Sequence, residues 1–425
     1  MREGLPILKP TAYAESNRSG SRDRMSQSEA FRHVAQVLRE AQRSAIEIEN
    51  APERRKRLRD FSVAEIASLW GVAPRLLRQA LPRQEVRGIA PRARLTFGEL
   101  QQARRQLEAQ GKLISTRRDP ASGEALATVV FTNFKGGSAK TTSSVHFAQY
   151  MALAGYRVLM VDLDSQGSAS AQFGFQPGLD VGAEGCFTAW LNRPVGSAAG
   201  SAARLCRPTY WPAIDLVPAS PALGEGEEIL ARRAGQGVEE GILYFDELKA
   251  FLSMVQDRYD IAVVDTRPDV NMLMSTALHA ATGIIVPSRA TMTDLASTGE
   301  FFAHLSDYTA EFQAAFGHGL DFAFSHILLT AFDPTDRSQD ALAQLIRERF
   351  GSLVLREAFL HSRIVGTAGF GKETLYEYEP STDRAAYNRA IASANAVNRA
   401  IEAAILRHWG RASGEGRPGR KEQQA

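Results

Sequence analysis

Short apolar runs recur along the C-terminal two thirds of the chain. They occupy residues 127 to 132, 158 to 163, 261 to 265, 283 to 287 and 324 to 330, and stretches with helical spacing separate them. Continuous apolar runs of this length are typical of parallel strands that helices cover on both faces. We therefore predict an α/β domain with a doubly wound, mostly parallel sheet, whose ligand site lies at the carboxyl ends of the strands.

The N-terminal third shows helical spacing instead. Residues 28 to 49 predict an amphipathic helix, because apolar residues recur there at steps of three and four: Phe31, Val34, Leu38, Ala41, Ala45 and Ile48. An apolar stripe of this kind needs a partner. A second copy of the chain and this chain's own domain are alternatives that stay open.

A pair of short helices is predicted next. Ser62 and Glu65 form a capping box that starts the first helix, Gly71 ends it, and Pro74 suits the first turn of the second. This spacing is typical of a helix-turn-helix, whose second helix enters the major groove of DNA. Since guanidinium and amide groups suit base edges and phosphates, we predict DNA contacts by three residues of that helix: Arg75, Arg78 and Gln79.

A second capping box, Thr96 to Glu99, predicts a third helix in this region. The connection before it holds basic residues that would follow the DNA backbone as a wing: Arg87, Arg92 and Arg94. Residues 51 to 120 contain 16 Lys and Arg against 7 Asp and Glu, a net charge of +9, whereas the whole chain carries only +2. This excess favours a DNA-binding role over a merely solvated basic face. The region resembles an all-α, winged helix-turn-helix module of the MerR type.

A glycine turn with two lysines follows the first apolar run of the C-terminal region. It reads Lys135-Gly136-Gly137-Ser138-Ala139-Lys140-Thr141-Thr142. Backbone N–H groups of such a turn bind phosphate together with the positive end of the following helix, while a lysine offsets phosphate charge and a threonine ligates Mg²⁺. We therefore predict that these eight residues bind ATP and that Thr141 is a magnesium ligand.

This turn departs from the ordinary phosphate-loop pattern. That pattern has glycine where this chain has Asn133 and Ala139, and it has no lysine as early as Lys135. A second ammonium group that its own phosphate does not require can reach the nucleotide of a partner subunit. The sequence therefore predicts a homodimer joined by ATP. A glycine turn with solvated lysines is the alternative, and the order of strand, turn, lysine and threonine pair argues against it.

Three aspartates stand at the ends of apolar runs, namely Asp162, Asp164 and Asp265. An acid at the end of a buried strand is aimed at the edge where phosphoryl transfer needs a metal and an in-line nucleophile. We expect Asp265 to hold Mg²⁺ through water and Asp162 to join the same shell. One such aspartate alone is more often a cap or a turn residue, but three in register with a phosphate loop favour a catalytic site.

Together these motifs resemble the ParA/MinD family of ATPases, whose deviant Walker A box reads Lys-Gly-Gly-x-x-Lys-Thr-Thr. Residues 158 to 167 are similar to the family's Asp-x-Asp-x-Gln-Gly strand and turn, and residues 259 to 266 to its Walker B strand. The segments 371 to 377 and 385 to 390 are similar to the plasmid-partition branch called RepA, from repABC replicons. The resemblance covers most of residues 124 to 405, and it implies that the predicted sheet is of P-loop NTPase type.

The resemblance implies a catalytic set and a cycle. Asp164 would position the attacking water, with Lys135 and Lys140 beside it. The family implies an ATP-hydrolysing DNA-partition protein that dimerises on ATP, binds DNA and is released when a ParB-like partner stimulates hydrolysis, so that a low-copy plasmid or a secondary chromosome is segregated. It also implies autorepression of the operon through the helix-turn-helix.

Alternatives stay open for several basic residues and for the function as a whole. Nonspecific DNA contact is implied near the C-terminal part of the ATPase, with Arg363, Lys372 and Arg389 as candidates, although each alone is more often solvated. The family has two prolines after the Walker B threonine, whereas here Arg267 stands first; tuning of hydrolysis, contact with DNA or a partner, and a surface salt bridge all stay open for it. A nucleotide-gated repressor in which hydrolysis is dispensable is the rival function.

Composition agrees with a reduced, cytoplasmic protein, and the resemblance implies that it is nucleoid-associated. The length of 425 residues predicts two or three domains, and the two cysteines, Cys186 and Cys206, lack the spacing of a metal site or a disulfide framework. No apolar run approaches the roughly 18 residues of a membrane span, so we expect no membrane partner. The expected segments are a disordered N-terminus (1–25), an arm helix (26–55), the helix-turn-helix domain (56–120), the ATPase domain (124–410) and a disordered tail (411–425).

Overall fold

The computed structural model describes residues 26–49, 56–81, 94–194, 197–236, 243–317, 319–370, 373–380 and 383–411. The chain divides into two compact units, Met1–Arg57 and Leu58–Ala425. In the first unit, helix α2 (Gln27–Glu49) agrees with the predicted amphipathic helix. Its apolar residues Phe31, Val34 and Leu38 are 72%, 50% and 64% exposed. The two segments expected to be disordered lie outside the described residues, apart from Arg411.

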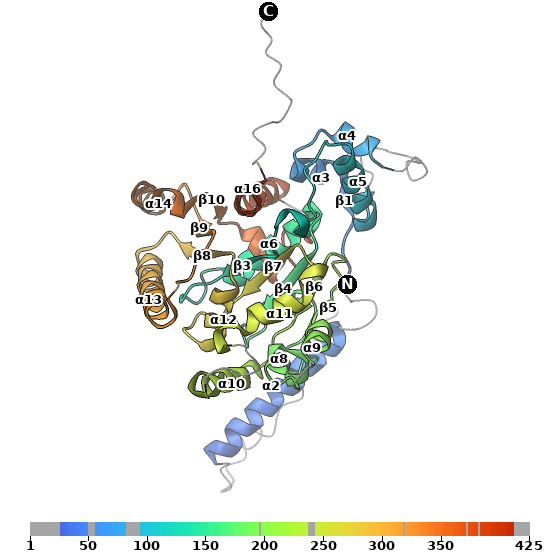
Figure 1. Cartoon of the computed structure of the whole chain (residues 1–425). Coiled ribbons are helices and arrows are strands. Elements are labelled where there is room, and N and C mark those ends of the chain that lie inside the picture. The colour runs from blue at the N-terminus through green and yellow to red at the C-terminus, as the bar shows by residue number, and fades with distance from the viewer. Residues whose placement is uncertain are drawn as a thin grey trace, which may run out of the picture. The chain divides into compact units, whose positions relative to one another are not determined.

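The second unit is built on an eight-stranded sheet (Figure 1). Its order is β10 (Val354–Leu360), β9 (Phe324–Phe332), β8 (Gly283–Arg289), β3 (Ala127–Phe131), β7 (Ile261–Asp265), β4 (Val158–Asp162), β6 (Ile214–Val217) and β5 (Arg207–Pro208). All neighbours are parallel except β5 and β6. The predicted doubly wound, mostly parallel sheet is confirmed, and strands β5, β6 and β10 are additions to the five expected ones.

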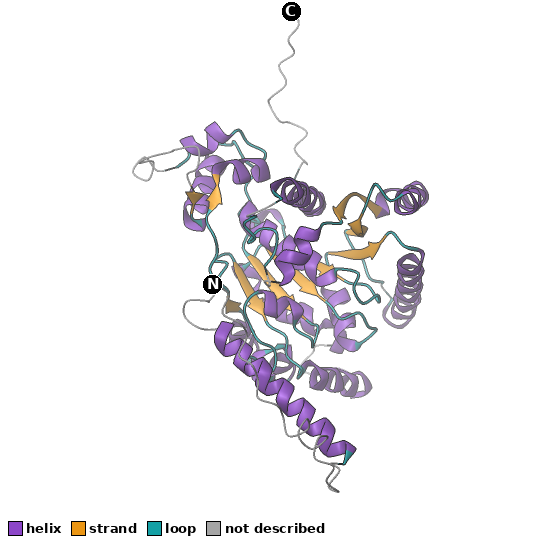
Figure 2. Ribbon diagram, turned by 180° about the vertical axis from the view of Figure 1, so that it is seen from behind, coloured by secondary structure: helices purple, strands orange, loops and turns teal. Residues whose placement is uncertain are grey.

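Helices cover both faces of this sheet (Figure 2). Val129 and Val263 face a core shared with α6 (Lys140–Ala154) and α16 (Arg384–His408). Val130 and Val264 face the opposite core, because successive side chains of a strand point to opposite faces. The helices of that second side are α8 (Phe187–Leu191), α9 (Ala198–Leu205), α10 (Leu223–Gln236), α11 (Glu247–Val255), α12 (Met272–Ala280) and α13 (Met292–Phe316).

Three further helices lie after strands of the sheet. α7 (Ser168–Gln172) follows β4, and α15 (Arg363–Phe370) follows β10. α14 (Arg337–Phe350) packs on β9 and β10 through Ala343 and Ile346, in a small core of its own. None of the described helices is both long and apolar enough to cross a membrane.

The predicted helix-turn-helix region begins this second unit. It contains β1 (Phe61–Ser62), α3 (Val63–Trp70), α4 (Pro74–Gln79), β2 (Arg94–Leu95) and α5 (Phe97–Ala109). Both capping boxes are present, and Gly71 ends α3 with a positive φ of 64°. We predicted an all-α region, but β1 and β2 pair in it as a short antiparallel ladder. Strands of two residues are too short to show an alternating pattern in the sequence.

This module packs directly on the sheet domain. The indole nitrogen of Trp70 donates to the carbonyl of Leu153 at 2.9 Å, and Gln101 Nε2 donates to the carbonyl of Ala152 at 3.1 Å, both at the C-terminal end of α6. Arg399 on α16 donates to the carbonyl of Leu69 at 3.2 Å. The helix-turn-helix core and one face of the sheet therefore form one continuous apolar cluster.

Candidate nucleotide-binding site

The predicted phosphate loop connects β3 to the N-terminus of α6. The ammonium group of Lys140 donates to the carbonyl of Lys135 at 2.9 Å, which folds the lysine back over the turn. Thr330 Oγ1, near the end of β9, donates to the carbonyl of Ser138 at 3.0 Å and so connects the phosphate loop to a neighbouring strand of the sheet. Burial lowers the pKa of Lys140 to about 8, against the opposing attraction of Asp265 and Asp164.

The two departures from the ordinary loop pattern have structural consequences. Asn133 replaces a glycine and shapes the turn: its Oδ1 accepts from the N–H of Lys135 at 3.2 Å, and its Nδ2 donates to the carbonyl of Pro287 at 2.8 Å. Ala139 replaces the other glycine and has a φ of 70°. That left-handed conformation costs a non-glycine residue roughly 1–2 kcal/mol, so the loop stores strain directly before Lys140.

Two acids meet at the carboxyl ends of neighbouring strands. Asp162 and Asp265 are register partners on β4 and β7, and both are fully buried. Thr141 Oγ1 donates to Asp265 Oδ2 at 2.7 Å, whereas Asp265 Oδ1 is buried without a hydrogen-bond partner among the described residues. Burial, and then the charge of Asp162, raises the pKa of Asp265.

This donor set fits a hard divalent cation. Two buried carboxylates side by side repel each other, and a cation bound near them relieves that repulsion. The unpartnered Oδ1 of Asp265 and the hydroxyl of Thr141 are oxygen donors of the kind that Mg²⁺ takes, directly or through water. The described residues contain no group of three His, Cys, Asp or Glu side chains that would hold a metal alone, so phosphate and water oxygens would complete the shell.

Asp162 also organises the turn that carries Asp164. Its Oδ2 accepts from the N–H and the hydroxyl of Ser170 at 2.8 and 2.7 Å, and its Oδ1 accepts from the N–H of Asp164 at 3.1 Å. Asp164 Oδ1 in turn accepts from the N–H of Gln166 at 2.9 Å. Sequence reasoning missed Ser170, because a serine at the start of a helix carries no distinctive signal.

The remaining loop residues lie on the accessible side of the turn. Gly136 and Gly137 are exposed and Lys135 is partly exposed. No hydrogen bond or ion pair joins Lys135 Nζ to the part of the chain that the structure describes. Thr142 lies in the first turn of α6, where its carbonyl accepts from Nδ1 of His146 at 2.7 Å. The structure thus brings the eight loop residues and the three acids to one edge of the sheet.

The residues predicted to contact DNA are distributed over several elements. Arg75, Arg78 and Gln79 are exposed on α4. Arg94 on β2 forms an ion pair with Glu379 and donates to the carbonyl of Asp60 at 3.1 Å, so its guanidinium group already has protein partners. Two candidates are exposed on C-terminal helices, Arg363 on α15 and Arg389 on α16, and three lie outside the described residues, Arg87, Arg92 and Lys372.

Arg267 is partly exposed in the loop after β7. Burial raises the pKa of Glu227 on α10, and the positive charge of Arg267 acts in the opposite direction on that pKa. Glu227 accepts from the N–H groups of Met272 and Leu273 at 2.8 and 3.0 Å, at the start of α12. The alternatives that the sequence leaves open for Arg267 therefore all stay open.

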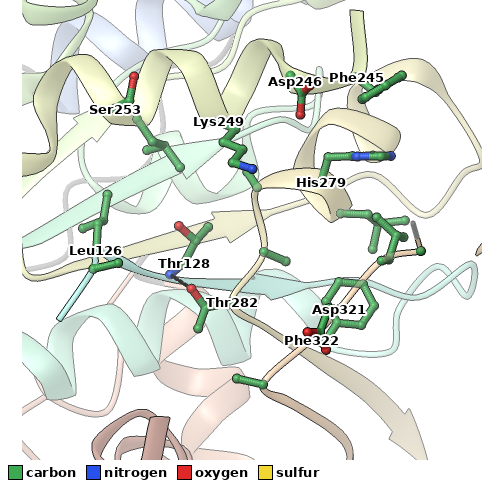
Figure 3. A pocket seen from close by; sticks show the side chains of 18 of the residues that line it. Leu126, Thr128, Phe245, Asp246, Lys249, Ser253, His279, Thr282, Asp321 and Phe322 are labelled. Atoms are coloured by element: carbon green, nitrogen blue, oxygen red, sulfur yellow. Dashed lines mark hydrogen bonds between the residues drawn. The ribbon is translucent and has the colours of Figure 1, made fainter. Parts of the chain in front are cut away.

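A cavity of about 790 Å³ lies at the other edge of the sheet (Figure 3). Its wall includes Thr128, Thr282 and Phe322, which stand at the amino ends of β3, β8 and β9, and Lys249 and His279 from α11 and α12. Phosphate loops follow the carboxyl ends of strands. The cavity is therefore separate from the nucleotide site.

Comparison with known proteins identifies the family. Residues 126–316 match the family model described as AAA domain. A putative replication protein A of Sinorhizobium fredii (strain NBRC 101917 / NGR234) is 34% identical over 371 residues, which cover 85% of this chain and 89% of that protein. The chain belongs to the ParA/MinD family of partition ATPases.

Other members of the family are more distant from this ParA-type chain. Protein SopA of Escherichia coli (strain K12) is 29% identical over 342 residues, covering 77% of this chain and 83% of that protein. A solved structure named Partition Protein superposes with a TM-score of 0.58 at 18% identity, covering 88% of this chain and 98% of that one, which shows the shared fold. The resemblance drawn from the sequence motifs is confirmed.

Proposed function

We propose that this ParA-type ATPase is an ATP-hydrolysing DNA-partition protein that dimerises on ATP and binds DNA. With a ParB-like centromere-binding partner it segregates a low-copy plasmid or a secondary chromosome, and it represses its own operon. The observation that carries the proposal is the pairing of Asp162 with Asp265 beside a phosphate loop whose Thr141 is bonded to Asp265. A helix-turn-helix packed on the same domain supports the DNA-binding part.

The chemistry follows from the positions of these residues. ATP phosphates would bind to the N–H groups of Gly136 to Thr142 and to the ammonium group of Lys140. Bound Mg²⁺, held by Thr141 and through water by Asp265 and Asp162, would offset charge on the phosphate oxygens. Asp164 would orient the attacking water. Lys135 lies on the accessible side of the loop, and it is proposed to reach the nucleotide of the second subunit.

DNA binding is proposed at two places. Arg75, Arg78 and Gln79 on α4 would read the operator, with the basic connection before β2 following the backbone as a wing. Arg363, Lys372 and Arg389 would contribute nonspecific phosphate contacts in the ATP-bound dimer. Arg75→Ala with Arg78→Ala should lower operator affinity, whereas Arg105→Ala, an exposed arginine on α5, serves as a matched control.

The central experiment measures ATP hydrolysis by the purified chain with and without DNA and the cognate ParB-like protein. Weak turnover that rises with both additions and disappears in Lys140→Ala and Asp164→Ala supports the partition function. An NTPase site that lacks its own arginine finger gains rate when a partner supplies one, which would account for weak turnover of the chain alone.

The rival is a nucleotide-gated repressor in which hydrolysis is dispensable. The direct contact between α3 and the nucleotide-binding helix α6 favours nucleotide control of the DNA-binding module. Asp164→Ala separates the two functions. A partition protein with this change keeps ATP and operator binding but loses plasmid maintenance, whereas a repressor loses nothing. Tight ATP binding without turnover under any condition would favour the repressor.

A further inference from the structure

A second cavity, of about 420 Å³, opens beside the segment that follows β7. Its wall is mainly apolar and comes largely from that segment, from α12 and from α13: Val270, Met272, Met274, Leu278 and Leu305. Glu227 of α10 and Tyr244 also line it. Polar groups stand among them. Tyr308 OH lies 2.5 Å from Ser275 Oγ and 2.8 Å from His279 Nε2, so its hydroxyl is held within the protein. The cavity thus offers mainly apolar surface to an incoming group.

The cavity adjoins the nucleotide site on two sides. His304, which lines it, packs edge-on against the ring of Phe134 with 5.6 Å between ring centroids. Phe134 directly precedes Lys135 of the phosphate loop, and it also contacts Phe301 at 5.1 Å. On the other side, Val270 and Asn271 belong to the loop that begins directly after Asp265 and Thr266. A group in the cavity would therefore touch neighbours of the phosphate loop and of the segment that follows Asp265.

The surface beside the cavity is acidic. Helix α13 contains four acids and no Lys or Arg in its 25 residues. Three of these acids, Glu300, Asp307 and Glu311, are exposed and share a stripe with His304, since they stand at helical steps of four, three and four. Val270 adds an apolar side chain that is 49% exposed. An anionic ligand such as nucleic acid would be repelled here, whereas a cationic segment would be attracted.

We infer that this cavity is the docking site for a basic segment of the partner protein, which inserts one apolar side chain between α12 and α13 and lays Lys or Arg along the acidic stripe. The inference rests on the proposed function, and it identifies the surface on which the ParB-like partner acts. Burial of the apolar side chain provides the anchor, and the charges provide selectivity and speed of association.

Docking at this place has a consequence for hydrolysis. The loop between β7 and α12 is fixed at its far end by two caps: Asn271 Oδ1 accepts from the N–H of Met274 at 2.7 Å, and Glu227 accepts from Met272 and Leu273. An inserted side chain packs against Val270 and Asn271 within that loop. The partner therefore acts on the residues that follow Asp265 without entering the phosphate loop itself.

Two variants test the docking site. The triple change Glu300→Lys, Asp307→Lys and Glu311→Lys reverses the stripe at exposed positions, and Leu305→Trp fills the cavity. Glu348→Lys on α14 is the control for charge reversal at an exposed acid away from the cavity. Basal ATP turnover and thermal unfolding are measured first, and then partner affinity and stimulated turnover are measured with the cognate ParB-like protein and with 20-residue peptides that cover it.

The expected result is a loss of partner affinity by about tenfold or more in the triple variant, from like-charge contacts, with basal turnover unchanged within about twofold and wild-type behaviour of the α14 control. The inference is overturned if the triple variant is stimulated like the wild type. If Leu305→Trp does not fold, the triple variant decides alone, because its positions are exposed. Absence of stimulation in the wild-type protein would instead overturn the proposed partition function, and the docking site with it.

Discussion

The hydroxyl of Thr141 donates a 2.7 Å hydrogen bond to the carboxylate of Asp265 and so joins the first turn of α6 to the end of β7. Thr141→Val keeps the shape of the side chain and removes the donor. We expect Mg²⁺-dependent ATP affinity to fall by at least about tenfold, since the variant loses the hydroxyl that is proposed to ligate Mg²⁺. Titration calorimetry with ATP, with and without Mg²⁺, measures this.

The control for Thr141 is Ser144→Ala in the same helix. The Ser144 hydroxyl donates only to the carbonyl of Thr141, at 3.0 Å, which is a bond within the helix. We expect this variant to bind ATP as the wild type does. If the wild type, Thr141→Val and Ser144→Ala bound Mg²⁺-ATP with equal affinity, the assigned role of Thr141 would be contradicted.

Ala139 holds a left-handed conformation, with φ of 70°, at the position where the ordinary loop has glycine. Ala139→Gly should relieve strain and raise the free energy of unfolding by on the order of 1 kcal/mol, partly offset by the greater freedom of glycine in the unfolded chain. Ala139→Val should lower it by more than that, because a β-branched residue fits this conformation poorly. Thermal unfolding of the three proteins tests the order, and a valine variant as stable as the wild type would refute it.

Gly167 ends the turn that carries Asp164, and it tolerates no side chain. Its φ is 62°, and an added Cβ would lie 2.1 Å from Cγ of Pro177. Gly167→Ala should therefore destabilise the protein by more than about 2 kcal/mol and reduce hydrolysis by displacing Asp164. Gly174 is the matched control, because its φ is 87° but nothing lies within 4 Å of its added Cβ. Gly174→Ala should therefore lose only the stability that a non-glycine residue loses at positive φ. If the two variants unfolded at similar temperatures, a clash with Pro177 would be excluded as the cause of the destabilisation in Gly167→Ala.

His146 links α6 to the segment near Tyr376. Its Nδ1 lies 2.7 Å from the carbonyl of Thr142, and its Nε2 accepts from the N–H of Leu375 at 3.1 Å, which requires the neutral ring. Burial lowers the pKa of His146 below its usual value of about 6.5, against the opposing attraction of Glu377.

The pH dependence of stability follows from that lowered pKa. Below about pH 6.5 the unfolded chain binds a proton at this position that the folded chain does not bind, so stability falls as the pH drops, by up to about 1.4 kcal/mol per pH unit until the folded pKa is reached. In His146→Gln this contribution disappears. Unfolding temperatures measured between pH 5 and 8 should therefore fall less steeply for the variant, and parallel profiles would contradict the assignment.

Much of the nucleotide site could be predicted because its parts are local in sequence. The phosphate loop is one continuous turn, and each acid stands at the end of an apolar run, so strand order alone brings Asp162 and Asp265 together. The bonds that fix these residues could not be predicted in the same way. Ser170 meets Asp162, and Thr330 meets the carbonyl of Ser138, only through the tertiary path of the chain.

In the fold, too, the features that are local in sequence could be predicted and the tertiary contacts could not. Helix caps such as Ser62 with Glu65 depend on residues three apart, so the starts of α3, α4 and α5 and the end of α3 at Gly71 were predicted correctly. Strand β6 was missed because Asp215 interrupts its apolar pattern, and β10 because Arg356 and Glu357 interrupt its pattern. The contact of Trp70 with Leu153, 83 residues away, needs the three-dimensional packing and leaves no trace in local spacing.

The helix that begins at the phosphate loop ends against the predicted helix-turn-helix region. α6 runs from Lys140 to Ala154, and the carbonyls of Ala152 and Leu153 near its far end hold Gln101 and Trp70. Its 15 residues make a rigid arm of about 22 Å, so a tilt of about 5° at the phosphate end moves the other end by about 2 Å. A small tilt of α6 at the nucleotide end would therefore become a displacement of the helices that are proposed to face DNA.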